Sequence, residues 1–255
     1  MAVKIKIENL YKTFNGVSVL EDVKFKVEEG EAIAIVGASG CGKSVLMKCI
    51  SGLILPDKES LIYINNIECS ALNVADRPPN IRDTIGMLFQ SNALFDSMTV
   101  GENITFGLLH KISKYGFLTQ SQRETLIKVA KEKLEIVGLA VNNLDKYPYE
   151  LSGGMQKRVA IARSISMQPE IILLDEPTTG LDPVTAYNIS QLMKDIRKQM
   201  SSTIIAITHD PMCAAEIADR IILIDNKTVA WAGKLHQLSN ATSPYIDAFK
   251  RVIKA

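Results

Sequence analysis

Short apolar runs rich in Ile and Val recur along the chain without alternating with polar residues. Such runs are typical of strands that are buried on both faces of a parallel sheet. The first part of the chain differs, because Lys4–Glu8 and Val23–Glu28 alternate apolar and charged residues, as half-exposed antiparallel strands do. We therefore expect an α/β fold with a mostly parallel sheet core and an antiparallel β part. The expected buried strands are Ala32–Val36, Ile85–Phe89, Ile171–Leu174, Thr203–Ile207 and Ile221–Asp225.

Helical periodicity fills the segments between these runs. After Lys43 the apolar residues fall on one face of a helix, and Gly52 provides its end. Asp182 and Pro183 form a cap followed by proline at the first helical position, which predicts the start of another helix. The buried face of that second helix is expected to comprise Ile189, Leu192, Met193, Ile196 and Met200.

Residues 92–165 lack the buried-strand pattern, and we interpret them as a helical insertion in the α/β core. Two capping boxes are predicted there, Thr99-x-x-Glu102 and Ser121-x-x-Glu124, each at the start of a helix. Gly116 and its polar neighbours predict a loop. The second of these helices is expected to bury a face made of Leu126, Ile127, Ala130, Leu134 and Val137.

The last residues predict one more helix, with Ser243 and Pro244 at its start. Two alternatives for its apolar face stay open. The helix packs on the chain's own sheet, which we favour, or it clasps a second copy or a partner. Trp231, which follows a short strand expected at Thr228–Ala230, is expected to be a packing residue. The apolar face of the last helix consists of Tyr245, Ile246, Phe249, Val252 and Ile253.

Composition narrows the class of protein. The 255 residues contain 29 Lys and Arg against 28 Asp and Glu, a net charge of +1, whereas nucleic-acid-binding domains are usually strongly basic. We therefore expect no nucleic-acid partner.

The four cysteines form no C-x-x-C pair, which argues against a zinc site and a disulfide framework. The first residues lack the apolar core of a signal peptide, and no apolar run approaches the roughly 20 residues that cross a bilayer, so a membrane role is expected to come through a partner.

A phosphate-binding motif lies between the strand expected at Ala32–Val36 and the helix after Lys43. Gly37–Ser44 matches G-x-x-x-x-G-K-[ST] in the strand–loop–helix context that the motif requires. Its glycines let backbone N–H groups face phosphate oxygens, and the helix N-terminus adds partial positive charge. Lys43 is expected to bind the β- and γ-phosphates, and the Ser44 hydroxyl to bind Mg²⁺. The residues expected to bind the nucleotide here are Gly37, Ala38, Ser39, Gly40, Cys41, Gly42, Lys43, Ser44 and Val45.

Two carboxylates end the apolar run Ile171–Leu174. Asp175 and Glu176 would lie at the carboxyl end of a strand, where open α/β sheets bind their ligands. We expect Asp175 to hold Mg²⁺ through water, and Glu176 to orient or deprotonate the attacking water. The alternative is a strand that simply ends in acidic residues, and the phosphate-binding motif disfavours it.

A second anion site is predicted at Leu151–Met155. Ser152 caps a helix there, and Gly153 and Gly154 occupy its first turn, where free N–H groups attract anions. An ordinary glycine-rich cap is the alternative. A single nucleotide does not need two phosphate cradles, so one nucleotide bound within one chain does not account for the second cradle.

The order of these motifs resembles that of an ABC-transporter ATPase subunit over the whole length of the chain: the phosphate loop, Gln90, the LSGG sequence, Asp175-Glu176 and then His209. The resemblance implies one ABC ATPase domain with the P-loop NTPase fold, which binds ATP and Mg²⁺ and hydrolyses ATP. In such a domain, residues 1–91 and 166–242 would form a RecA-like core with the antiparallel β part, 92–165 a helical signature subdomain and 243–255 a C-terminal helical tail.

The resemblance also implies roles for single residues. Ser152, Gly153 and Gly154 would contact the γ-phosphate of ATP bound to a second copy, so that two composite ATP sites form in a head-to-tail homodimer. Gln90 would contact Mg²⁺ and the attacking water. His209 would lie near the γ-phosphate as the switch histidine.

Two further assignments follow from the same resemblance. Asp182 would belong to the D-loop, Gly180-Leu181-Asp182, which crosses the dimer interface. Phe14 would stack on adenine, with Tyr11 as the weaker alternative, and such stacking gives modest base selectivity. The expected catalytic residues are thus Glu176, His209 and Gln90, and the expected metal-binding residues are Ser44, Gln90 and Asp175.

The sequence departs from the family pattern in two places. Met155 replaces the glutamine of the usual LSGGQ, and Thr179-Gly180 replaces the frequent Ser-Ala at the start of the D-loop. The serine and both glycines of the signature remain, so we expect γ-phosphate binding to persist. After the signature, Lys157, Arg158 and Arg163 are expected to form a solvated helix face, with support of a neighbouring phosphate as the alternative.

The segment Gln90–Leu108 carries apolar side chains that we expect in a surface groove, and exposed apolar patches mark partner contacts. In the family, this groove receives a short helix of an integral membrane permease subunit. The alternative is that Leu94 and Phe95 fill the core of the helical region itself.

This segment and the LSGGM sequence are similar to those of the ATPases of Mla-type transporters, bacterial systems that move phospholipids through the envelope with an MCE-domain lipid-binding protein. The resemblance implies a peripheral protein on the cytoplasmic face of the bacterial inner membrane. An importer ATPase for amino acids or another small solute stays open as the alternative. A soluble ABC machine of DNA repair or translation is disfavoured by the single set of motifs and the near-neutral charge.

Overall fold

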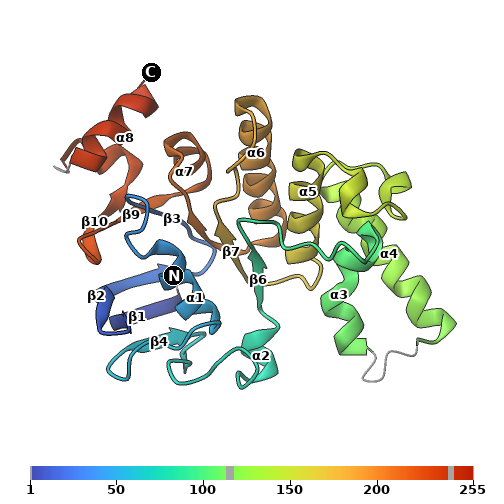
Figure 1. Cartoon of the computed structure of the whole chain (residues 1–255), viewed down its shortest axis with the longest axis horizontal. Helices are drawn as coiled ribbons and strands as arrows, with labels where there is room; N and C mark the ends of the chain where they lie inside the picture. The colour runs from blue at the N-terminus through green and yellow to red at the C-terminus, as the bar shows by residue number, and fades with distance from the viewer. Residues whose placement is uncertain (1, 113–117, 241–243, 255) are drawn as a thin grey trace.

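Two β-sheets occupy one end of the molecule, and a group of helices forms the other (Figure 1). The computed structural model describes residues 2–112, 118–240 and 244–254. The antiparallel sheet has the order β2-β1-β4-β5, and its strands are β1 Val3–Phe14, β2 Val17–Glu28, β4 Leu61–Ile64 and β5 Ile67–Glu68. The second sheet has the order β10-β9-β3-β8-β7-β6, with β10 Thr228–Lys234, β9 Arg220–Asp225, β3 Ala32–Val36, β8 Thr203–Ile207, β7 Ile171–Asp175 and β6 Ile85–Leu88.

The six-stranded sheet is mostly parallel, as the apolar runs predict. β3 pairs in parallel with β8 and β9, and β7 pairs in parallel with β6 and β8, whereas β10 runs antiparallel to β9. Every residue of β3, β7 and β8 is buried, because helices or strands cover both faces. The five buried strands predicted from the sequence are confirmed to within one residue at each end.

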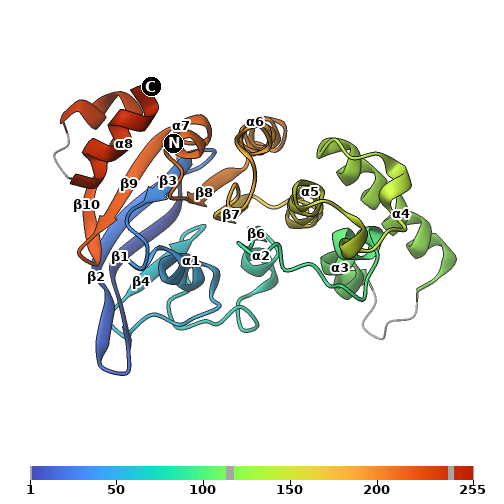
Figure 2. The ribbon, with the colours of Figure 1, turned by 45° about the horizontal axis from the view of Figure 1, so that its top comes forward.

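Two different layers cover the parallel sheet, as Figure 2 shows. Ile33 and Ile35 of β3 pack with the antiparallel sheet and with α1, Lys43–Ser51. Ala32, next to Ile33 in the alternating pattern, packs toward the opposite layer. That layer includes α5 Gly153–Ser164, α6 Pro183–Met200 and α7 Pro211–Ile217. Gly52 ends α1 and Asp182 caps α6, as predicted.

The first hairpin is longer than its alternating pattern predicts. β1 continues to Phe14 and β2 begins at Val17, and these two residues pair directly. Asn15 and Gly16 form the turn with φ values of 48° and 78°, a conformation that favours Asn-Gly in two-residue hairpins. Irregularities in the strand register interrupt the alternation between the two ends, so the sequence pattern shows only part of each strand.

The helical region is formed by α3, α4 and α5 (Figure 1). The Thr99–Glu102 capping box is confirmed at the start of α3, Val100–Ile112. The Ser121–Glu124 box is wrong, because α4, Gln120–Ile136, begins earlier. Its cap is Thr119, whose hydroxyl accepts from the Gln122 N–H while the Gln122 side chain accepts from the Thr119 N–H.

Two further predictions concern α4 and the loop expected before it. Ile127 was expected on the buried face of α4 but is 51% exposed, because the helix turns this position away from Leu126 and Ala130. The loop expected at Gly116 lies outside the described residues. Short helical turns complete the connections, namely α2 Pro79–Arg82, η1 Val141–Asn143, η2 Pro148–Glu150 and η3 Leu235–Asn240.

The last helix, α8, spans Pro244–Lys254 and packs on the chain's own sheet, as favoured. Ile246 and Phe249 are 2% and 3% exposed, in a cluster with residues of β3, β9 and α7. Val252 was expected on the same face but is 47% exposed, and Ser243 lies outside the described residues. Trp231 packs partly against this cluster as expected, but it lies within β10 rather than after a strand.

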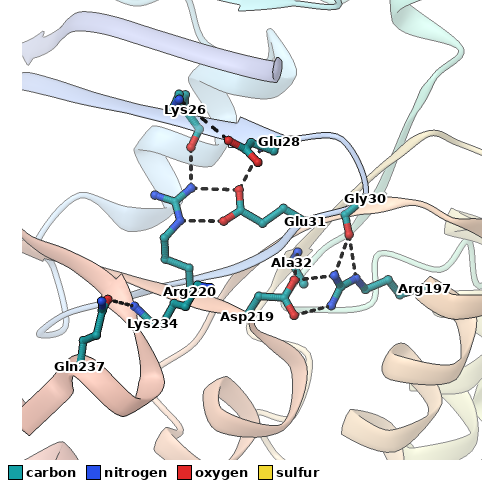
Figure 3. Close-up of polar contacts among 10 residues, drawn as sticks. All are labelled: Lys26, Glu28, Gly30, Glu31, Ala32, Arg197, Asp219, Arg220, Lys234 and Gln237. Carbon is teal, nitrogen blue, oxygen red and sulfur yellow. Dashed lines mark hydrogen bonds and ion pairs between the residues drawn. The ribbon is translucent and has the colours of Figure 1, made fainter. Parts of the chain in front are cut away.

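Two arginine–carboxylate pairs join the elements at the amino ends of β3 and β9 (Figure 3). Arg220 binds the Glu31 carboxylate through Nε at 2.7 Å and Nη2 at 3.0 Å. Arg197 of α6 binds Asp219 and also the Gly30 carbonyl, with 2.6 Å from Nη2 to that oxygen. These contacts join the elements at the amino ends of the parallel strands. The loops at the opposite, carboxyl ends of the strands are left for a ligand.

The four cysteines are free thiols, and Cys49, Cys69 and Cys213 are buried. Burial raises the pKa of the Cys49 and Cys213 thiols to about 11.

Within residues 2–112, 118–240 and 244–254, no helix combines the length and the apolar composition that crossing a membrane requires.

Candidate nucleotide site

A cavity of about 320 Å³ lies beside the loop that joins β3 to α1. Most of its lining comes from the segments that follow β3, β6, β7 and β8, four neighbouring parallel strands, and Val19 of β2 completes it. The motifs, which are far apart in sequence, therefore meet at the carboxyl ends of these strands. The lining residues are Val19, Ser39, Gly40, Gly42, Lys43, Ser44, Val45, Gln90, Glu176 and His209.

The phosphate loop requires glycine at two crowded positions. Gly42 has φ 99°, and a Cβ atom there would lie 2.7 Å from Leu20 Cδ2 and 3.0 Å from the Val19 carbonyl oxygen. At Gly37 a Cβ atom would lie 2.3 Å from the carbonyl oxygen of Ile224. Gly42 is also the N-cap of α1 and no side chain caps that helix, so its first N–H groups are available to an anion.

The Lys43 ammonium is held inside the loop. The side chain is 7% exposed, and Nζ donates to the carbonyl oxygens of Gly37 at 2.9 Å and Ala38 at 2.8 Å. Cys41 Sγ lies 3.8 Å from the same nitrogen. The loop's own backbone therefore keeps a buried cation in place at the cavity wall, where it favours a phosphate.

Ser44 and Asp175 provide adjacent oxygen ligands. The Ser44 hydroxyl donates to Asp175 Oδ1 at 3.2 Å, and Asp175 is 6% exposed at the end of β7. Burial raises the pKa of Asp175, and the hydroxyl of Ser44 and the charges of Lys43 and Lys48 act in the opposite direction. A hydroxyl and a buried carboxylate are the hard oxygen donors that Mg²⁺ prefers, so these residues fit that ion.

Glu176 and His209 form a close pair in the cavity wall. Glu176 Oε2 lies 2.8 Å from His209 Nδ1, and its side chain is 11% exposed against 62% for the histidine. Glu176 has φ 50°, an uncommon left-handed conformation, and its N–H donates to the Ile207 carbonyl at 2.9 Å. A carboxylate and an imidazole so placed can accept and pass on a proton.

The structure does not bring every predicted site residue into this cavity. Ser152 caps α5, accepting from the Met155 N–H at 3.3 Å, and it lies exposed with Gly153. Asp182 caps α6 through the N–H groups of its first turn. Phe14 is 40% exposed at the end of the first hairpin. The predicted residues outside the cavity lining are Phe14, Gly37, Ala38, Cys41, Ser152, Gly153, Gly154, Asp175 and Asp182.

The prediction of a solvated face after the signature is wrong. Lys157 is 2% exposed and donates to the Gln90 carbonyl at 3.1 Å, which joins α5 to the loop after β6. Burial lowers the pKa of Lys157, and Asp175 and Glu176 act in the opposite direction. Arg158 and Arg163 likewise donate to backbone carbonyls. Helical spacing contains the missed signal, since Lys157 shares a face with buried Ala160, Ile161 and Ser164.

The segment after Gln90 divides between the two alternatives. Leu94 packs partly against the core of the helical region, whereas Phe95 is 40% exposed. The Phe95 ring lies 4.6 Å from that of Phe106, and buried Asn103 donates to the Phe95 carbonyl at 3.0 Å. A fixed backbone therefore holds one aromatic ring at the surface.

Comparison with known proteins places these features in a family context. The model of the family described as ABC transporter matches residues 20–179. The chain is 36% identical over 251 residues to the probable ribonucleotide transport ATP-binding protein mkl of Mycobacterium leprae, covering 98% of this chain and 69% of that protein. It is 34% identical over 264 residues to the chloroplastic protein TRIGALACTOSYLDIACYLGLYCEROL 3 of Arabidopsis thaliana, covering 97% and 73%.

Two further similarities widen the comparison. The methionine import ATP-binding protein MetN of Carboxydothermus hydrogenoformans is 39% identical over 232 residues, covering 90% of this chain and 66% of that protein. Among solved structures, an ATP-binding cassette in a dimeric post-hydrolysis state bound to ADP and Pi superposes with a TM-score of 0.79. That cassette is 34% identical, and the match covers 91% of this chain and 98% of the other.

Proposed function

Because this chain belongs to the ABC transporter family and is an ATP-binding, ATP-hydrolysing member of it, we propose that two copies power a transporter that moves phospholipids across the bacterial envelope. The observation that carries the nucleotide chemistry is the cavity where the phosphate loop faces the Glu176–His209 pair.

Each side chain in the cavity receives a role from its chemistry. Lys43 exchanges its loop carbonyls for the β- and γ-phosphate oxygens. Ser44 and Asp175 hold Mg²⁺, which neutralises phosphate charge when it is bound, and Gln90 reaches the same region from the loop after β6. Phe14 stacks on adenine from the hairpin, with Tyr11 as the alternative.

Hydrolysis needs a base next to the γ-phosphate. Glu176 accepts a proton from the attacking water, and His209 contacts both the carboxylate and the transferred phosphoryl group. Glu176 is 8% exposed, which limits competition from bulk water for its carboxylate.

A second copy completes each site. Ser152 and Gly153 are exposed, and nothing lies within 4 Å of the position where a Cβ atom of Gly153 would be, so the helix N-terminus is open to a ligand. These residues do not line the cavity of their own chain. In a head-to-tail pair they face the γ-phosphate bound by the other copy, with Asp182 at the interface. The similar cassette bound to ADP and Pi was solved as a dimer, which supports this arrangement.

Closure of the pair transmits the energy of ATP binding. Residues 92–165 act as a helical signature subdomain against the core of 1–91 and 166–242, and 243–255 act as a C-terminal helical tail. Permease subunits dock near Gln90–Leu108, where Phe95 is exposed, and the chain works from the cytoplasmic face of the inner membrane. ATP binding favours the closed state of the pair, and hydrolysis of ATP allows the pair to open again. The equilibrium between the open and closed states shifts by the difference between their affinities for ATP.

Phospholipid is the proposed cargo, delivered with an MCE-domain protein. Two features support it, the LSGGM signature with its neighbouring segment, and a relative whose name contains a glycerolipid. An importer for amino acids or another small solute is the second candidate, because a methionine import ATP-binding protein is 39% identical.

The test is mass spectrometry of what co-purifies with the tagged chain from native membranes in mild detergent. We expect a multispanning permease, an MCE-domain protein and bound phospholipid. Recovery of a permease together with a solute-binding protein, and without an MCE-domain protein, would contradict the lipid proposal and support the second candidate.

A further inference from the structure

The carboxylate of Glu176 has a further contact besides the one with the His209 imidazole. The Thr179 hydroxyl lies 3.1 Å from Glu176 Oε2, the same oxygen that lies 2.8 Å from His209 Nδ1 and 3.4 Å from the His209 backbone nitrogen. An ionised carboxylate only accepts hydrogen bonds, so the hydroxyl donates. All three of these contacts fall on the same oxygen, Oε2.

Thr179 does not belong to the nucleotide cavity. It lines a separate hollow of about 510 Å³ between the starts of α6 and α7, which is also lined by His209. Glu176 lines the nucleotide cavity but not this hollow. The Glu176–His209 pair therefore lies between the nucleotide cavity and this hollow, and Thr179 contacts Glu176 from the side of the hollow.

The backbone brings Thr179 to this place. Glu176 has φ 50°, and the Thr179 N–H donates to the Glu176 carbonyl at 3.3 Å, which closes a tight turn directly after β7. The turn returns the threonine side chain toward the carboxylate three residues earlier. The short threonine side chain thus brings its hydroxyl to Glu176 Oε2.

We infer that Thr179 is a positioning residue for ATP hydrolysis, whose hydroxyl fixes Glu176 Oε2 and so leaves Oε1 for the attacking water. The inference rests on the proposed role of Glu176 as the base. With Oε2 bound by Thr179 and His209, the carboxylate cannot rotate freely, and its second oxygen keeps one direction. Small misplacements of a catalytic group have large effects on rate, because the reacting atoms must lie within a narrow range of distances.

The experiment compares Thr179→Val, which removes the hydroxyl at nearly constant volume, with Thr179→Ser, which keeps it. The full chain is assayed in complex with the membrane proteins that co-purify with it, as a function of ATP concentration. We expect Thr179→Val to lower kcat about tenfold, a loss of about 1.4 kcal/mol in transition-state stabilisation, with KM for ATP changed less than about twofold. Thr179→Ser is expected to restore kcat to within about twofold of the parent chain.

Thr178→Val is the matched control. Thr178 is the neighbouring threonine and is more deeply buried, and its hydroxyl bonds to Asp210 Oδ2 at 3.3 Å rather than to Glu176. We expect this variant to affect thermal stability more than kcat. A kcat loss in Thr178→Val equal to that in Thr179→Val would overturn the inference, as would an unchanged kcat in Thr179→Val or an equal loss in Thr179→Ser.

Glu176→Gln separates this inference from the proposal beneath it. If Glu176→Gln abolishes turnover while Thr179→Val leaves it unchanged, only the role of Thr179 is wrong. If Glu176→Gln hydrolyses ATP at the parent rate, the base assignment and the role of Thr179 are both wrong. We expect Glu176→Gln to abolish turnover, Thr179→Val to lower kcat about tenfold, and Thr179→Ser to restore it.

Discussion

Single residues of the phosphate loop are constrained more by space than by their own chemistry. Gly40 and Gly42 both have left-handed φ values, 79° and 99°, so any L-residue is strained at either position. They differ in their surroundings. A Cβ atom at Gly40 meets nothing within 4 Å, whereas at Gly42 it meets Leu20 and the Val19 backbone. The sequence motif specifies Gly42 and leaves position 40 free, whereas the structure shows that the backbone is left-handed at both positions and crowded only at Gly42.

The pair Gly42→Ala and Gly40→Ala tests this difference. We expect Gly42→Ala to lower the free energy of unfolding by about 2–4 kcal/mol, the sum of strain and overpacking, and to weaken ATP binding by at least about tenfold. Gly40→Ala is expected to cost about 1–2 kcal/mol, from strain alone. Urea unfolding and titration with a fluorescent ATP analogue measure both effects. Equal losses in the two variants would contradict the steric account.

Helix caps combine structural and functional roles at the scale of an element. Ser152 caps α5 and Thr119 caps α4, and each accepts a hydrogen bond at 3.3 Å from a backbone N–H in the first turn. The two hydroxyl bonds have the same length, and at Thr119 the Gln122 side chain also accepts from the cap N–H. Only the first belongs to the signature that is proposed to meet the γ-phosphate bound by a second copy.

Ser152→Ala and Thr119→Ala therefore form a matched pair. Both are expected to lower the free energy of unfolding by about 1 kcal/mol, the usual contribution of a helix cap. Ser152→Ala is also expected to reduce ATP turnover by about tenfold or more, because in the proposed dimer its hydroxyl donates to the transferred phosphoryl group. Chemical denaturation and steady-state kinetics provide the two measurements. A similar loss of turnover in Thr119→Ala would mean that the signature serine acts only through helix stability.

The elements themselves show how far a sequence can be interpreted alone. Buried parallel strands were predictable, because a continuous apolar run of strand length is typical of a strand that is covered on both faces. The first hairpin was predicted only in part, since bulges break its alternation and its Asn15-Gly16 turn was not recognised. The start of α4 was missed because two overlapping boxes, at Thr119 and Ser121, both fit the capping pattern.

Side chains that combine charge with burial were the main failure in the site. Lys157 has a charged head but lies on the apolar face of α5, and its partner is a backbone carbonyl 67 residues away. Composition alone places such a residue in solvent. The cavity residues Lys43, Glu176 and His209 were predictable because each belongs to a motif with a fixed place relative to a strand.

At the scale of the whole molecule, α8 closes the outer layer of the parallel sheet. Phe249 is 3% exposed in a cluster with β3, β9 and α7, and Val252 is 47% exposed on the same helix. The helix packs on β3, which continues into the phosphate loop, and on α7, which follows His209. Its attachment therefore bears on the stability of the core around the site.

Phe249→Ala and Val252→Ala test that attachment. We expect Phe249→Ala to cost about 3 kcal/mol, because it leaves a cavity in a packed cluster, and to speed amide exchange along α8. Val252→Ala is expected to change stability by less than about 0.5 kcal/mol. Thermal unfolding and hydrogen exchange are the measurements. Rapid exchange of α8 in the parent chain as well would contradict its docking on the sheet.

The central claim is that a second copy of the chain completes each ATP site. The most direct test is the mass in solution of Glu176→Gln, which should bind ATP without turnover, measured by light scattering with and without MgATP. One copy has a mass of 28.1 kDa. We expect a mass twice that value with MgATP, the single-copy mass without it, and no doubling when Ser152 and Gly153 are also replaced by bulky residues. If the variant binds MgATP at saturation and stays at the mass of one copy, each ATP site is complete within a single chain.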